Sequence, residues 1–143
     1  MTTSNPVNYY AEIPEIVQMM SSVNQKIVGT GFNRAIHHLV QLRASQINGC
    51  GFCVKMHTKE AREDGETNDR LDRVIVWRHV DDFTEAEQVA LEWTEALTIL
   101  KENMDYSDIR GRLRDHFSDK DISILTAAIS MINMWNRFQI SGH

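Results

Sequence analysis

Long apolar runs and a surplus of positive charge are missing from this chain of 143 residues, and helix breakers are scarce. No stretch approaches the roughly 20 consecutive apolar residues of a transmembrane helix, so a membrane-spanning protein is not expected. The formal net charge of −5 provides no basic patch for nucleic acid or for an anionic membrane surface. Only seven glycines and two prolines are present, which favours long helices.

A secretory signal is also missing from the start of the chain. Residues 1–18, MTTSNPVNYYAEIPEIVQ, contain neither a basic segment nor an apolar core of the kind that signal peptides carry. We therefore expect a cytoplasmic protein. In the cytoplasm a pair of closely spaced cysteines is more often catalytic or metal-binding than a structural crosslink.

Apolar residues recur with the helical period along most of the chain, and no alternating β-branched run indicates a strand. We therefore predict one all-α domain over residues 1–143, with six or seven helices and no internal repeat. An arm, residues 1–13, precedes the helices. The predicted helices cover about residues 14–29, 32–47, 50–64, 67–75, 84–100, 107–117 and 118–138, and residues 77–82 form a loop.

Several helix boundaries have local sequence signals. Pro14 fits the first position of a helix. Thr84 and Glu87 have the spacing of a capping box, and Ser118 can cap the last helix. Gly65 suits the position just after a helix C-terminus.

Three of these helices contain residues that other parts of the structure must cover or pair. The first has an apolar face made of Ile16, Met19, Met20, Val23 and Ile27. Arg43 lies near the middle of the apolar stripe of the second helix, so its charge needs a carboxylate or carbonyl partner. The last helix is apolar almost all round, which indicates either a central core helix or a helix buried by another subunit.

The two cysteines of the chain lie in one short motif, Cys50-x-x-Cys53, and His57 follows it. On a helix that starts at Cys50, a step of 100° per residue puts both thiols and the imidazole on one face. A turn signal at residues 48–49 puts Cys50 at or near the helix N-terminus, where the helix dipole favours a thiolate. This arrangement is typical of a redox-active dithiol.

The residues alone leave two other interpretations of the motif open, a metal half-site and a structural or coincidental pair. The other histidines have ordinary interpretations outside the chemistry. We predict that His37 is a surface residue of its helix and that His79 lies in a loop or an interface. His116 is predicted to lie at a helix end and His143 in the tail.

The segment from His38 to His57, HLVQLRASQINGCGFCVKMH, resembles the core of the AhpD-like alkylhydroperoxidases of the carboxymuconolactone decarboxylase superfamily. The likeness covers roughly residues 30–100 and includes the Arg-x-Ser-Gln-x-Asn-Gly run just before Cys50. It implies a compact all-helical fold that assembles as trimers or hexamers and reduces hydroperoxides. It also implies a lipoyl-bearing or thioredoxin-like protein as the reductant. We expect no bound cofactor or metal.

The resemblance assigns a role to each residue of the motif. It implies that Cys53 attacks the peroxide, that Cys50 resolves the product as a disulfide, and that His57 belongs to a proton relay. At the other end of the relay, twelve residues before the first cysteine, His38 stands where better-known members have a glutamate. Phe52 replaces a histidine of the best-studied members.

We therefore take thiol-dependent reduction of hydroperoxides by Cys53, Cys50, His57 and His38 as the leading hypothesis. One alternative is a Cys₂His₂ metal site made of the same four residues. The other is a redox sensor that keeps the dithiol but reduces peroxide slowly. Lactone decarboxylation is not expected, because the members named for that reaction lack the cysteine pair.

Overall fold

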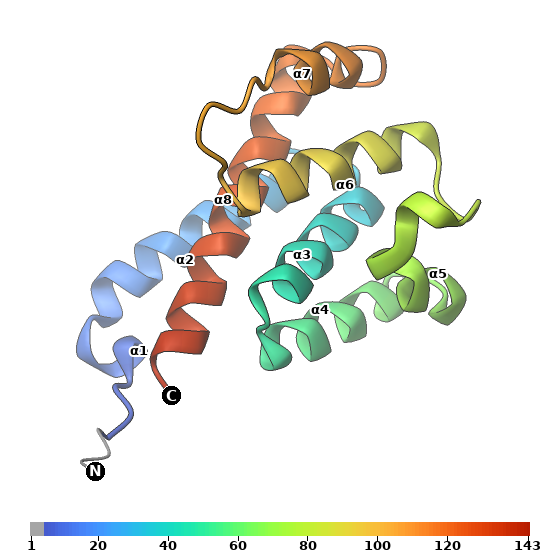
Figure 1. Cartoon of the computed structure of the whole chain (residues 1–143). Helices are drawn as coiled ribbons and strands as arrows, with labels where there is room; N and C mark the ends of the chain where they lie inside the picture. Colours follow the sequence, from blue (N-terminus) through green and yellow to red (C-terminus); the bar gives the residue numbers. More distant parts are fainter. Residues whose placement is uncertain (1–4) are drawn as a thin grey trace.

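The computed structural model describes residues 5–143, and the regular structure in these residues is entirely helical (Figure 1). This confirms the predicted all-α class. The described residues form eight α-helices and one 3₁₀ helix: α1 (Tyr9–Glu12), α2 (Pro14–Gly29), α3 (Arg34–Asn48), α4 (Gly51–Glu63), α5 (Asn68–Arg73), the 3₁₀ helix η1 (Val74–His79), α6 (Glu85–Thr98), α7 (Ser107–Leu113) and α8 (Asp119–Ser141).

The predicted boundary signals act as expected. The side chain of Thr84 accepts a hydrogen bond from the Glu87 N–H, and the Glu87 carboxylate accepts one from the Thr84 N–H, which completes the capping box. Ser118 caps α8 by accepting from the Asp121 N–H. Gly65 follows α4 with a φ of 95°, a left-handed conformation that glycine adopts without strain.

Some predicted boundaries were wrong. Part of the expected arm is the short helix α1, and residues 1–4 lie outside the described residues. The expected loop at residues 77–82 begins inside η1, because Trp77 is buried and anchors that segment to the core. Leu100 lies beyond the end of α6 and is exposed. Helix α7 ends at Leu113 rather than at residue 117, and α8 continues to Ser141.

Helix α3 is at the centre of the structure and packs against α4, α6 and α8 (Figure 1). Its side chains contribute to two hydrophobic clusters, and α6 also contributes to both. The first cluster joins α3 and α6 to α7 and α8, and the second joins them to α4, α5 and η1. Because different sides of α3 are covered in this way, Leu39, Val40 and Leu42 are all fully buried.

Helix α2 lies on the outside of the structure, beside α8 (Figure 1). Of the apolar face that the sequence predicts for it, only Ile27 is buried. Ile16, Met19 and Val23 are exposed, because α2 contacts the rest of the chain mainly along one neighbouring helix. Within residues 5–143, no helix is both long enough and apolar enough to cross a lipid bilayer.

The partner that Arg43 needs is Glu95 of α6. The Arg43 guanidinium donates from Nε to Glu95 at 2.8 Å, and the indole N–H of Trp77 donates to the same carboxylate at 3.1 Å. Arg78 binds the other oxygen of Glu95. This cluster confirms the predicted need for a partner and joins α3, η1 and α6.

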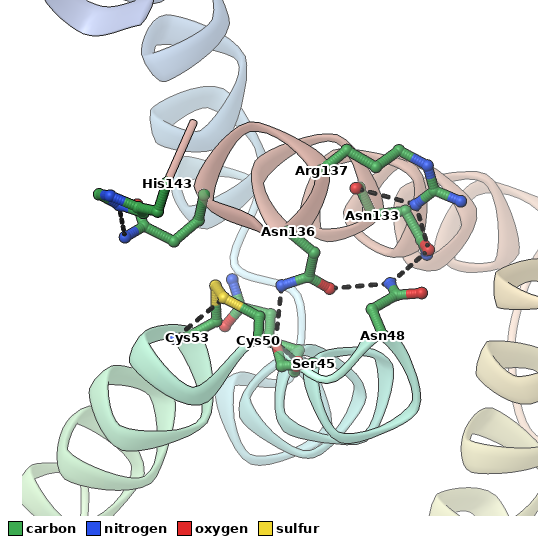
Figure 2. The surroundings of a disulfide bond; sticks show 10 residues. Ser45, Asn48, Cys50, Cys53, Asn133, Asn136, Arg137 and His143 are labelled. Atoms are coloured by element: carbon green, nitrogen blue, oxygen red, sulfur yellow. Dashed lines mark hydrogen bonds between the residues drawn. A yellow bond between two sulfur atoms is a disulfide. The ribbon is translucent and has the colours of Figure 1, made fainter. Parts of the chain in front are cut away.

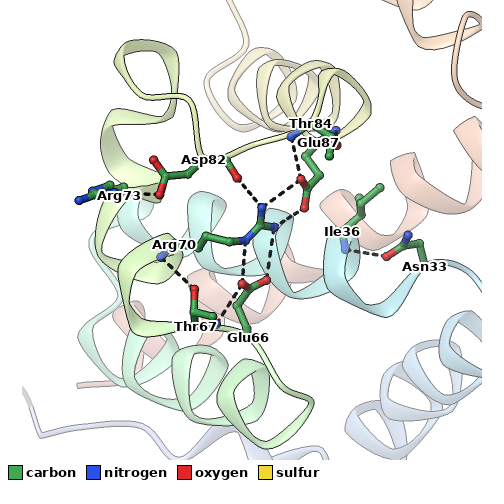
Figure 3. A network of polar contacts seen from close by, with 9 residues as sticks. All are labelled: Asn33, Ile36, Glu66, Thr67, Arg70, Arg73, Asp82, Thr84 and Glu87. Atoms are coloured by element: carbon green, nitrogen blue, oxygen red, sulfur yellow. Dashed lines mark hydrogen bonds and ion pairs between the residues drawn. The ribbon is translucent and has the colours of Figure 1, made fainter.

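A second partly buried cation, Arg70 of α5, bridges two chain segments (Figure 3). It donates to Glu66 at 2.8 Å, to the Asp82 carbonyl at 2.5 Å, and with both terminal nitrogens to Glu87 of α6. The side chains of Glu66 and Glu87 are only 10% and 9% exposed. Arg70 thus holds α5 against the capped start of α6.

Candidate redox site

The cysteine motif sits on a tight connection between α3 and α4. Gly49 ends α3 with a φ of 71°, and Cys50 follows as the N-cap residue of α4. The Sγ atom of Cys50 accepts a hydrogen bond from the Cys53 N–H at 3.3 Å. The two cysteines are joined in a disulfide (Figure 2). The predicted helix start is confirmed, although Cys50 caps the helix in an extended conformation instead of lying on its face.

Buried amide side chains attach this connection to α8 (Figure 2). The Asn48 Nδ2 donates to Asn133 at 2.9 Å and to Asn136 at 3.0 Å. Asn136 is fully buried and donates from its own Nδ2 to Ser45 at 3.0 Å. These bonds satisfy polar groups that would be costly to bury alone, and they hold the end of α3 next to Cys50 in a defined position.

A cavity of about 270 Å³ opens beside the disulfide, between α2, α3, α4 and α8. Cys53, His57 and His38 all line it, so the structure brings together three of the four predicted site residues. Cys50 is buried but does not line this cavity. The rest of the wall consists of Asn24, Val28, Arg34, His37, Gln41, Met56, Glu60 and Trp135.

His57 is buried and lies one turn after Cys53 on α4. Its Nδ1 atom is 3.3 Å from the Glu60 carboxylate, close enough for an ion pair when the ring is protonated. Burial lowers the pKa of His57, and the charge of Glu60 acts in the opposite direction. The imidazole is therefore a neutral proton acceptor near pH 7, with a carboxylate that stabilises the protonated form.

His38 has a carboxylate partner that the sequence did not reveal. Its Nε2 lies 2.5 Å from Asp64, the C-cap residue of α4, and Arg34 contacts the same carboxylate oxygen at 2.7 Å. The hydrogen bond from His38, followed by that from Arg34, lowers the pKa of Asp64. His38 thus has a carboxylate partner in Asp64, which it shares with the guanidinium of Arg34.

His37 was predicted to be a surface residue, and this was wrong. It is only 8% exposed and lines the cavity together with His38 and Cys53. Burial, and then the neighbouring His38 and His57, lower its pKa to about 4. The prediction failed because α2 and α4 enclose this side of α3, whereas helical periodicity assigns only one buried face to a helix.

Two further residues of the site escaped the sequence prediction for different reasons. Glu60 is three residues after His57 on one helix, and that spacing could have identified it. Asp64 is 26 residues from His38, and only the packing of α3 against α4 brings the two together. Among residues 5–143, no three His, Cys, Asp or Glu side chains cluster closely enough to hold a metal ion.

Comparisons with known proteins agree with this description of the fold. The chain matches the carboxymuconolactone decarboxylase family over residues 14–96. It is 33% identical to the uncharacterized protein YdfG of Bacillus subtilis (strain 168) over 138 residues, which cover 96% of this chain and 94% of YdfG.

Solved structures show the same fold. ATU0492 from Agrobacterium tumefaciens superposes with a TM-score of 0.91 at 37% identity, over 97% of this chain and 95% of its own. ATU0492 is a protein of unknown function for which a role in antioxidant defence, as AhpD, has been suggested. An uncharacterized peroxidase-related protein from Silicibacter sp. TM1040 superposes with a TM-score of 0.81 over 93% of this chain and 71% of its own, but at 18% identity that likeness shows the fold alone. The chain thus belongs to the carboxymuconolactone decarboxylase family and has the AhpD-like fold.

Proposed function

We propose that this protein reduces hydroperoxides with the Cys50–Cys53 dithiol. The observation that carries the proposal is the asymmetry of the two cysteines. Cys53 lines the cavity together with three imidazoles, whereas Cys50 is buried outside it and bonded to Cys53. A solute that enters the cavity meets Cys53 first, which suits Cys53 as the attacking thiol and Cys50 as the resolving one.

The reaction begins from the reduced dithiol. His57 accepts the proton of Cys53, and the thiolate attacks the terminal oxygen of a hydroperoxide ROOH. The O–O bond breaks, the sulfur becomes a sulfenic acid, and RO⁻ takes up a proton to leave as the alcohol ROH. The Cys50 thiol then displaces water from the sulfenic acid and forms the disulfide. A partner dithiol reduces the disulfide by exchange and is itself oxidised to a disulfide. Each cycle therefore converts ROOH and one partner dithiol to ROH, water and the partner disulfide.

The carboxylates beside the imidazoles support this proton transfer. Glu60 stabilises the protonated form of His57, which makes the ring a stronger base towards the thiol. His38, paired with Asp64, lines the same cavity and can pass the proton on to the leaving oxygen. We propose a lipoyl-bearing or thioredoxin-like protein as the reductant, because α4 exposes Phe52 and Met56 beside the disulfide as a surface that a partner can approach.

The direct test is a thiol count on the fully reduced wild-type protein at neutral pH. One equivalent of hydroperoxide should remove both thiols of the chain within the turnover time, and dithiothreitol should restore them. Persistence of both thiols in excess peroxide would refute the proposal. A disulfide that forms readily while turnover with dithiothreitol stays slow would favour the redox-sensing alternative.

A second test addresses the base. The Glu60→Gln variant removes the charge that raises the pKa of His57, so the pKa of His57 should fall further below its ordinary value of 6.5. An NMR titration of the His57 ring measures this change directly. Glu63→Gln is the matched control, because Glu63 lies on the same helix but pairs with Lys59 on the surface. An unchanged or higher pKa in Glu60→Gln would show that Glu60 does not support the imidazolium.

A further inference from the structure

The buried polar atoms without a hydrogen bond are concentrated in one place. Among residues 5–143, all fully buried side-chain nitrogens or oxygens without a hydrogen-bond partner belong to four residues, His37, His38, His57 and Trp135. All four line the cavity that contains Cys53. A buried polar atom without a partner is costly, so such a cluster indicates a site whose partner is a bound molecule.

Two of these residues take no part in the proposed proton transfer. Trp135 comes from α8 and its indole nitrogen can only donate a hydrogen bond. Stacking against Tyr10, at 6.3 Å between ring centroids, and an edge contact with Phe138 hold the indole in place. These ring contacts limit the rotation of the indole.

His37 comes from α3, a different wall of the cavity, and its unpartnered atom is Nε2. Because burial lowers its pKa to about 4, the ring is neutral at physiological pH and carries one N–H. A ring with so low a pKa is a weak base, but its N–H can donate a hydrogen bond. The indole always carries its N–H, and the neutral His37 ring carries one at Nε2 in one of its two tautomers. Trp135→Phe and His37→Leu each remove one of these donors.

We propose that the Trp135 N–H and the His37 Nε2–H form an oxyanion site that binds the leaving oxygen of the hydroperoxide. This inference rests on the proposed function and adds a role for two residues. As the Cys53 thiolate takes the terminal OH, negative charge develops on the oxygen that leaves as RO⁻. Two fixed neutral donors in a buried cavity stabilise that charge more in the transition state than in the bound hydroperoxide, which is how such donors accelerate a reaction.

The test compares two oxidants whose leaving groups need this help to different degrees. The leaving group of tert-butyl hydroperoxide is a strongly basic alkoxide. The leaving group of peracetic acid is acetate, a far weaker base that needs little stabilisation. Reduced protein is mixed with each oxidant in a single turnover, and thiol loss is followed by rapid quenching. The variants are Trp135→Phe, His37→Leu and His37→Gln, because the glutamine amide can supply an N–H near the position of Nε2.

Trp135→Phe and His37→Leu should each slow the reaction with tert-butyl hydroperoxide by about tenfold or more, and the reaction with peracetic acid by much less. His37→Gln should recover most of the lost rate. The matched control is Trp93→Phe, whose indole N–H donates to Thr126 and not into the cavity. Alkylation of Cys53 by iodoacetamide reports on the thiolate, and its rate should be the same in all variants.

Equal slowing with both oxidants, or unchanged rates in Trp135→Phe and His37→Leu, would overturn the oxyanion site while leaving the proposed function standing. Slower alkylation in the same variants would also overturn it, because the defect would then lie in the thiolate. If the reduced wild-type protein reacts with neither oxidant, the proposed function fails and the oxyanion site fails with it.

Discussion

Replacing Cys53 with serine is expected to abolish peroxide consumption, with a loss of about three orders of magnitude or more, as for other enzymes that lose their nucleophile. A serine hydroxyl is almost isosteric with the thiol but is far less acidic, so it provides no nucleophile in the cavity that Cys53 lines. Because Cys53 is buried and its change to serine removes little volume, the fold should be kept.

Cys50→Ser is the informative control for this variant. Serine is a favoured N-cap residue, so it should preserve the start of α4 that Cys50 now caps. In the absence of reductant, this variant should still react once with peroxide, losing its single thiol and forming a sulfenic acid that dimedone traps. Thiol titration and mass spectrometry of the two variants distinguish the roles. A reactive Cys53→Ser protein beside an inert Cys50→Ser protein would show that the roles of the two cysteines are reversed.

Replacing Arg70 with methionine is expected to lower the free energy of unfolding by about 3–5 kcal/mol, because it leaves buried carboxylates without their counter-charge. Glu87 and Glu66 are about nine-tenths buried and both bind the Arg70 guanidinium. Methionine fills a similar volume but cannot pair with either of them. Urea denaturation measures the loss, and the melting temperature should fall by roughly 10–20 °C.

The same change at Arg112 is the matched control. Arg112 also contacts two carboxylates, Glu92 and Asp108, but its side chain is 44% exposed. Exposed ion pairs contribute little, so Arg112→Met should cost less than about 1 kcal/mol. Similar losses at both positions would show that burial does not set the strength of the Arg70 cluster.

The pH dependence of the Arg70 variant follows from Glu87. Burial raises the pKa of Glu87, but the Arg70 hydrogen bond and the backbone N–H of Thr84 outweigh it, so the pKa lies below its ordinary value of 4.5. In the wild type this carboxylate contributes stability above pH 4.5, which is lost as the pH falls through the lower folded pKa. Without Arg70 the pKa of Glu87 should rise. The stability difference between wild type and variant should therefore be largest near pH 7 and shrink towards pH 4.

The short-range features of the site could be predicted from the sequence. The turn at residues 48–49, the start of α4 at Cys50 and the placement of Cys53 and His57 on one helix depend only on neighbours within about two turns. Helical periodicity also identified the long helices, with errors where a buried anchor such as Trp77 orders a segment that has no periodic pattern of its own.

For partners that come from distant segments, the sequence predicted the chemical type of the partner but not which residue it is. The sequence showed that Arg43 needs a carboxylate, but not that Glu95, 52 residues away, provides it. The resemblance implied that His38 stands where better-known relatives have a glutamate, but nothing in the sequence indicated that Asp64, 26 residues away, would pair with it.

The sequence by itself determined the helical class, the Cys-x-x-Cys motif and the shared face of Cys53 and His57, because each follows from local backbone geometry and the period of the α-helix. Only the tertiary structure decided that His37 and Trp135 share a cavity with Cys53 and that Cys50 lies outside it. Those relations depend on how α2, α3, α4 and α8 pack together. Packing is set by the summed contacts of many side chains far apart in the chain, so no local pattern encodes it.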